Sequence, residues 1–293
     1  MGSGGINLYR EIKTEYKEWK LKTKEVASFR ELSTSLEDVA SYKGAYFDLF
    51  NGKLDVLVIK NFLIDKEIAG LLNRYERWPK ELFVDKSFGR TFGPTLIDSE
   101  ANLNSYFKKS KLFNSVFNES LGFDFFERFV YVMSILSGIN KNAINNPHLD
   151  NDNEFAATNI KYMHPYKGSL PIHCGMQFQD LYSECSNIGY YKDARNQLSY
   201  FIVIQYPEKG GELQLYDLLY SETPKFTDPQ KVRNFVSKTT ASKYYRPEVG
   251  DMFFFNGGQI WHRITQVRGG DPRISLSAFT APTPDSKGLV YWT

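Results

Sequence analysis

The chain has 293 residues, of which 42% are hydrophobic and 24% charged, a composition typical of a soluble globular protein rather than a disordered chain or a coiled coil. Its 36 basic and 34 acidic residues give a formal charge of +2, which excludes the strong positive field that nucleic-acid binding needs. Two cysteines are too few for a disulfide framework, and no apolar run reaches the roughly 20 residues that span a bilayer, so we expect a cytoplasmic protein with no membrane partner.

The N-terminal half is mixed, with helical patterns, a buried strand and a glycine-containing loop or short strand over 88–94. Residues 6–37 are rich in Lys and Glu, with apolar residues at helical spacing, and predict one or two amphipathic helices. A buried strand over 54–59 and a helix that begins at Asp65 come next. Helical patterns return over about 101–121 and 123–136.

Short strands separated by turns replace helices after residue 153. The predicted strands are 157–163, 171–178, 198–206, 212–216, 251–255, 261–265 and 274–280. The run Lys209-Gly210-Gly211 predicts a hairpin, and a helix is predicted over 228–237. The order favours a mainly β fold with flanking helices, a double-stranded β-helix or jelly roll of the cupin type. We expect a helical extension, residues 1–53, packed on a catalytic domain of residues 54–293.

His173 and Gly175 stand two positions apart on a predicted strand, so both face the same side. The usual ligand set of a non-haem Fe(II) oxygenase is two histidines and one carboxylate, written His-x-Asp/Glu with a distant His. Gly175 stands where the carboxylate is expected. This leaves two imidazoles and an open position at the metal that a halide could fill.

A second histidine and an arginine follow at supporting positions. Residues 247–258 predict a turn, a hydrophobic strand and a second turn. His262 then lies on the next predicted strand, where it is a plausible second metal ligand. Arg273 comes later, with Ser275 on the same strand face. A guanidinium binds a carboxylate through two hydrogen bonds and a hydroxyl adds a donor, which suits the distal carboxylate of 2-oxoglutarate.

Several blocks of sequence carry a resemblance to known enzymes. They are Ile172–Gly175, Gln197–Ile202, Pro207–Leu213, Gly250–Met252 with Phe255–Gly258, and the closing Tyr291–Trp292. From about residue 54 to the end, the chain resembles the freestanding Fe(II)/2-oxoglutarate-dependent aliphatic halogenases that chlorinate hapalindole-type and welwitindolinone-type indole alkaloids.

The resemblance implies a role for each matching residue. His173 and His262 would bind iron, chloride would take the position opened at Gly175, and Arg273 with Ser275 would bind 2-oxoglutarate. Ser199 matches a position that influences whether chlorine or hydroxyl is transferred. The match is poorer before residue 155, and the residues offered there as walls of a substrate pocket are Phe88, Arg90, Phe92 and Tyr162.

The implied activity is chlorination or bromination of an unactivated sp3 carbon of a freestanding small molecule, with Fe(II), 2-oxoglutarate, halide and O2 as cofactors and co-substrate. Succinate and CO2 would be released. The substrate is expected to be alkaloid-like, with a nucleotide or an amino acid left open, and no carrier protein or nucleic acid polymer is expected as a partner.

Two alternatives stay open at this point. The first is a hydroxylase in which water occupies the open position or Asp180 completes the ligand set. The second is a jelly-roll binding protein that has lost its metal, which the presence of both histidines together with Arg273 and Ser275 disfavours.

Overall fold

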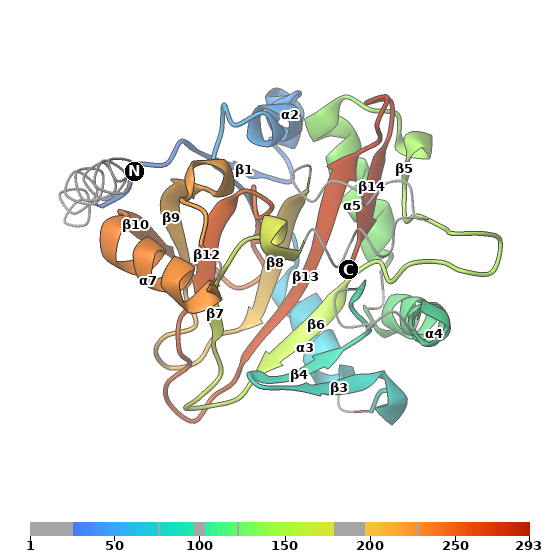
Figure 1. Cartoon of the computed structure of the whole chain (residues 1–293). Helices are drawn as coiled ribbons and strands as arrows, with labels where there is room; N and C mark the ends of the chain where they lie inside the picture. The colour runs from blue at the N-terminus through green and yellow to red at the C-terminus, as the bar shows by residue number, and fades with distance from the viewer. Residues whose placement is uncertain (1–25, 76, 97–102, 122, 179–196, 227) are drawn as a thin grey trace, which may run out of the picture.

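A computed structural model of the chain describes residues 26–293 except 76, 97–102, 122, 179–196 and 227. Within the described residues, two β-sheets face one another (Figure 1). The larger sheet has the order β1 (Glu31–Ser35), β2 (Val56–Lys60), β11 (Met252–Phe255), β8 (Leu198–Gln205), β13 (Arg273–Pro282), β6 (Asn159–Met163), β4 (Gly89–Phe92) and β3 (Phe83–Lys86). In addition, β14 (Leu289–Trp292) pairs with β13, and β5 (Ile144–Asn145) pairs with β14.

The smaller sheet packs against one face of the larger sheet. Its order is β10 (Ser242–Tyr245), β9 (Leu213–Leu219), β12 (Ile260–Ile264) and β7 (Leu170–His173). Apolar residues of both sheets form one cluster between them, such as Val203 and Phe253 from the larger sheet and Leu215 and Ile260 from the smaller. This is the predicted mainly β jelly roll, and the prediction of fold class is confirmed.

Helices cover the outer faces of the two sheets (Figure 1). Those that share the core of the larger sheet are α2 (Ala45–Phe50), α3 (Asp65–Tyr75), α4 (Leu103–Leu121) and α5 (Phe125–Ser137). On the smaller sheet, α7 (Pro229–Thr239) packs beside β7, with Phe235 and Val236 buried. Asp228 caps α7 by accepting a hydrogen bond from the Gln230 amide at 2.8 Å.

Strand β8 shows how burial on both faces shapes the sequence. Its residues are nearly all apolar because helices lie on one side and the smaller sheet on the other. Tyr200 and Ile202 point to the helices, whereas Phe201 and Val203 point between the sheets. Ser199 shares the face of Phe201, so a hydroxyl is placed among apolar neighbours on the inner side.

Two expectations about the chain path are wrong. Residues Glu31–Ser35 form an edge strand parallel to β2, not a helix, while residues 1–25 of the predicted helical segment lie outside the described residues. The run Lys209-Gly210-Gly211 does not close a hairpin, because β8 and β9 lie in different sheets. Gly210 and Gly211 adopt φ of 74° and 73° and turn the chain from one sheet to the other. The division at residue 53 stays a prediction, although β1 joins the same sheet as strands beyond it.

The strand predicted over 171–178 ends early. β7 stops at His173, and the 3-10 helix η5 (Gly175–Phe178) follows. The cause lies in the neighbouring turn, because Gly175 N donates to Gly257 O at 2.8 Å and Met176 N donates to Gly258 O at 3.0 Å. Gly175 is therefore held by a turn instead of a strand ladder.

Candidate active site

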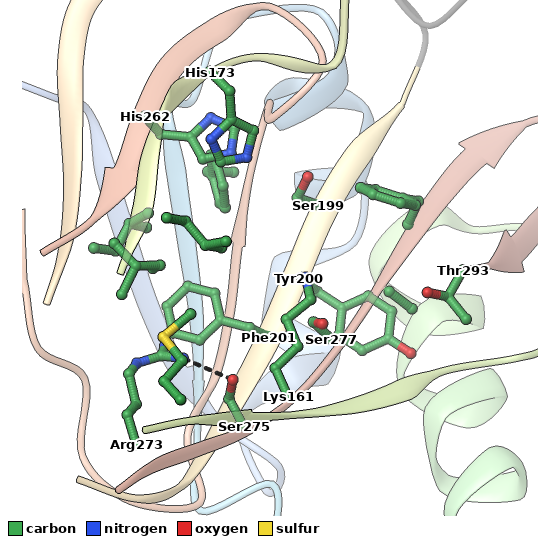
Figure 2. A pocket seen from close by; sticks show the side chains of 17 residues that line it. Lys161, His173, Ser199, Tyr200, Phe201, His262, Arg273, Ser275, Ser277 and Thr293 are labelled. Carbon is green, nitrogen blue, oxygen red and sulfur yellow. Dashed lines mark hydrogen bonds between the residues drawn. The ribbon is translucent and has the colours of Figure 1, made fainter. Parts of the chain in front are cut away.

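A cavity lies between the two sheets (Figure 2). Five of the predicted site residues line it, namely His173, Ser199, His262, Arg273 and Ser275. They come from β7, β8, β12 and β13, which are distant in sequence. Folding therefore brings the two histidines and the arginine to one cavity, with the histidines at one end and Arg273 toward the other (Figure 2).

The two histidines face each other across adjacent strands. His262 of β12 is the register partner of His173 of β7, and their ring centroids lie 4.2 Å apart. In each ring Nδ1 is bonded to a backbone carbonyl two residues before it, at 2.7 Å to Pro171 O and 2.8 Å to Ile260 O. These bonds place the proton on Nδ1 and the lone pair on Nε2, the tautomer that a metal-binding histidine requires.

Burial also keeps both rings neutral. It lowers the pKa of His173 to about 4, with a further lowering by Lys161 and Arg233. It holds the pKa of His262 well below the usual range, and the neighbouring His173 lowers it further. Since a metal binds only the neutral imidazole, the pair is ready to bind a metal at neutral pH.

Gly175 has no room for a side chain in its present surroundings. A Cβ atom placed on it would lie closer to Gln197 Nε2 than two non-bonded atoms can approach, and 3.0 Å from the Cα atom of Gly258. The position that a carboxylate would occupy is thus bordered by the amide of Gln197. Among the described residues, no group of three His, Cys, Asp or Glu side chains could hold a metal. Asp180 lies outside the described residues.

Arg273 is a buried cation, with 2% of its surface exposed. Its Nε donates to Gly211 O at 2.8 Å, and one terminal nitrogen donates to Ser275 Oγ at 2.7 Å, which confirms that these two residues share a strand face. No ion pair joins it to a carboxylate within the described part of the chain. Burial lowers the pKa of Arg273 to about 10, so the side chain is still charged at neutral pH. A buried charge of this kind needs an anion, and the carboxylate of 2-oxoglutarate would supply one.

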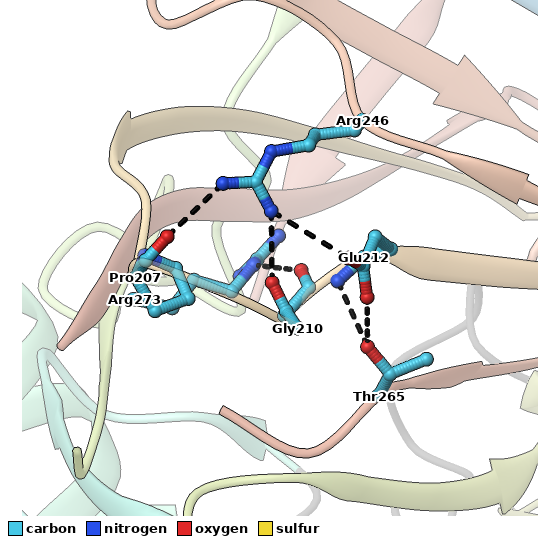
Figure 3. A network of polar contacts seen from close by, with 7 residues as sticks. Pro207, Gly210, Glu212, Arg246, Thr265 and Arg273 are labelled. Carbon is cyan, nitrogen blue, oxygen red and sulfur yellow. Dashed lines mark hydrogen bonds and ion pairs between the residues drawn. The ribbon is translucent and has the colours of Figure 1, made fainter. Parts of the chain in front are cut away.

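A polar network fixes the turn that holds Arg273 (Figure 3). Arg246 donates to Gly210 O and Pro207 O, both at 3.0 Å, and forms a 3.6 Å ion pair with Glu212. The hydroxyl of Thr265 in turn donates to the Glu212 carboxylate. The network sets the position of the Gly211 carbonyl, and through it the orientation of the Arg273 guanidinium.

None of the four residues offered as walls of a substrate pocket lines this cavity. Phe92 has no exposed surface and packs on Trp78, with ring centroids 3.9 Å apart, so that part of the prediction is wrong. Arg90 and Tyr162 are register partners, and the Arg90 guanidinium lies 5.8 Å from the Tyr162 ring centroid. Phe88 packs at the margin of the core between the sheets.

Lys161 lines the cavity and was not anticipated. It is adjacent to Tyr162, and side chains alternate along a strand, so Lys161 and Met163 face inward while Tyr162 faces outward. A lysine within an otherwise buried strand was the available signal. Gln197 was also missed, although it opens the sequence block that contains Ser199.

Fold and site together define the class of protein: a jelly-roll oxygenase of the 2-oxoglutarate and Fe(II) type, whose cavity brings together two histidines and a buried arginine. Among solved structures, the chain is similar to an N-substituted L-amino acid dioxygenase from Burkholderia ambifaria AMMD, at 15% identity and a TM-score of 0.54, over 87% of this chain and 91% of that one. The same dioxygenase in complex with α-ketoglutarate gives a TM-score of 0.51 at the same identity and coverage. At this identity the likeness shows the fold alone.

The particular family follows from the sequence. The family model of the carrier-protein-independent halogenase WelO5 matches residues 28–293, and the chain belongs to this family. It is therefore a non-haem iron, 2-oxoglutarate-dependent halogenase that uses chloride and acts on a freestanding small molecule without a carrier protein. No curated protein matches the chain. No helix among the described residues is both long and apolar enough to cross a membrane.

Proposed function

We propose that this halogenase chlorinates an aliphatic carbon of an apolar, alkaloid-like small molecule, with His173 and His262 as the iron ligands. The observation that carries the proposal is the pair of neutral imidazoles, each anchored through Nδ1, in one cavity with a buried and unmatched cation. When bound, iron and 2-oxoglutarate supply the oxidising chemistry that activates an aliphatic C–H bond. The protein positions these groups and excludes water.

Arg273 and Ser275 would receive the distal carboxylate of 2-oxoglutarate. The guanidinium keeps one face toward the cavity while its Nε is held by Gly211 O at 2.8 Å. The pre-ordered orientation reduces the entropy lost when the dicarboxylate binds. Since the carboxylate neutralises a buried charge, its binding should also stabilise the fold.

Gly175 would leave the third protein position at the metal open for chloride. Ser199 lies in the cavity wall, where its hydroxyl would act on the position of the reacting oxygen and so on the choice between chlorine and hydroxyl transfer. The remaining wall is mostly apolar, with Phe201, Phe255 and Phe279 among its members, which suits an apolar substrate.

An anaerobic titration tests the proposal without a substrate. Fe(II) and 2-oxoglutarate are added to the metal-free protein, and the visible metal-to-ligand charge-transfer band is followed with and without chloride. A band that forms and shifts saturably with chloride supports the assignment. A band that forms but does not respond to chloride would favour a hydroxylase, and the absence of a band would overturn the ligand assignment.

Product analysis then tests the substrate class. Indole alkaloids, nucleotides and amino acids are incubated with the loaded enzyme, chloride and O2, and products are examined by mass spectrometry for the chlorine isotope pattern. Chlorination confined to apolar alkaloid-like compounds is expected. Chlorination of amino acids or nucleotides alone would refute the proposed substrate class.

A further inference from the structure

A buried amide borders the gap at Gly175. Gln197 is 3% exposed and immediately precedes β8. A Cβ atom on Gly175 would clash with Gln197 Nε2 and would lie 3.3 Å from Gln197 Cδ. The end of the Gln197 side chain therefore lies beside the position where an oxygenase carries its carboxylate.

The backbone holds both residues to one turn. Gly258 N donates to Gln197 O at 3.3 Å, and Gly175 N donates to Gly257 O at 2.8 Å. Phe255 of β11 is paired with Ser199, two residues after Gln197. Gln197 is thus placed relative to Gly175 by backbone hydrogen bonds.

The chemistry of the amide matches an anion. The Gln197 Nε2 atom is the nearest atom to a Cβ built on Gly175, so the donor end of the side chain borders the opened position. An amide N–H that borders a site shielded from bulk water favours a ligand that accepts its hydrogen bond. A halide is a pure acceptor, whereas a carboxylate on residue 175 would need the space that the amide uses.

We infer that the Gln197 side-chain amide donates a hydrogen bond to the halide that occupies the position opened at Gly175. The inference rests on the proposed function, in which Gly175 leaves space for the halide, and adds that Gln197 donates a hydrogen bond to it. In this arrangement Gly175 provides the space, and Gln197 provides the hydrogen bond that favours an anion over water. Gln197 is then a halide-binding residue, since it contacts the anion directly.

The test uses Gln197→Met, which keeps the length and shape of the side chain and removes the donor. Gln214→Met is the matched control, because Gln214 is another buried glutamine, 5% exposed, whose amide is hydrogen bonded with Ser242 and Arg263 instead of bordering Gly175. Chloride is titrated anaerobically into each protein loaded with Fe(II) and 2-oxoglutarate, and the shift of the charge-transfer band gives the chloride dissociation constant.

We expect the band itself to form in both variants, and the chloride dissociation constant to rise about tenfold or more in Gln197→Met only, as for loss of a hydrogen bond to a charged group. A second variant, Gln197→Glu, replaces the donor by a carboxylate and should abolish the chloride shift at neutral pH. Chloride constants within twofold of the native value in both Gln197 variants would overturn the inference.

The outcomes separate this inference from the proposed function. If the native protein forms no band, or a band that ignores chloride, the proposed iron and halide site fails. If the native protein responds to chloride and the Gln197 variants respond equally well, only the role of Gln197 fails. Formation of the band in a variant shows at the same time that its site has folded.

Discussion

Replacement of Arg273 by Met should separate two effects of the buried charge: its effect on the stability of the fold and its effect on the affinity for 2-oxoglutarate. Burial lowers the pKa of Arg273 to about 10 from 12.5, so the charged form is disfavoured in the folded protein by roughly 3 kcal/mol. Met fills a similar volume without a charge but loses hydrogen bonds to Gly211 O and Ser275 Oγ, worth about 1 kcal/mol each. The gain exceeds the loss, so the free energy of unfolding of the ligand-free Arg273→Met protein should be about 1 kcal/mol higher than that of the native protein.

Binding of 2-oxoglutarate should respond in the opposite way. Removal of one partner of a buried ion pair costs about 3–5 kcal/mol, so affinity for 2-oxoglutarate should fall by at least a hundredfold in Arg273→Met. Urea denaturation gives the free energy of unfolding, and anaerobic titration in the presence of Fe(II) gives the affinity. Arg263→Met is the control, since Arg263 lies on β12 outside the cavity lining. A variant that loses several kcal/mol of stability yet binds 2-oxoglutarate normally would refute the reasoning.

Three further predictions concern the same site. In Gly211→Ala, the added Cβ would lie 3.0 Å from Arg273 Cδ on a backbone with φ of 73°. We expect the free energy of unfolding to fall by about 1–2 kcal/mol and the affinity for 2-oxoglutarate to fall about tenfold. Urea denaturation measures the first and anaerobic titration the second, and native values in both would contradict the prediction. Because the folded-state pKa of His173 is about 4, below its usual value, the metal-free protein should lose roughly 1–2 kcal/mol of stability as the pH falls from 7 to 5. Denaturation at both pH values should show a smaller loss in His173→Gln, and an equal loss would exclude His173 as the cause. Ser199→Ala should change the ratio of chlorinated to hydroxylated product while iron binding is retained; an unchanged ratio by mass spectrometry would exclude a role for the hydroxyl.

Local patterns in the sequence predicted much of the framework. A strand over 274–280 was expected, and the period of two placed Arg273 and Ser275 on one face, where they are hydrogen bonded. His262 was expected on a strand after a turn and is found on β12. These predictions succeeded because side-chain alternation and turn residues act over a few positions of the chain.

Predictions failed where the conformation of a segment depends on hydrogen bonds to another segment that is distant in the sequence. Gly175 was expected on the strand of His173, but backbone bonds to Gly257 and Gly258 end that strand. Residues Glu31–Ser35 were expected in a helix, but pairing with β2 makes them a strand. In each case hydrogen bonds to a distant segment outweigh the local propensity.

The sequence by itself determined the chemistry available to this halogenase: two histidines, a glycine two positions after the first of them, and an arginine with a serine on the same strand face. Only the tertiary structure decided which face of each strand looks into the cavity. Along β6 the alternation separates Lys161 from Tyr162 but does not say which one points inward. That choice depends on which face packs against the smaller sheet, since both faces of the larger sheet are buried and both select apolar residues. The same long-range packing places the Gln197 amide beside Gly175, a contact between residues 22 positions apart in the sequence that no local pattern specifies.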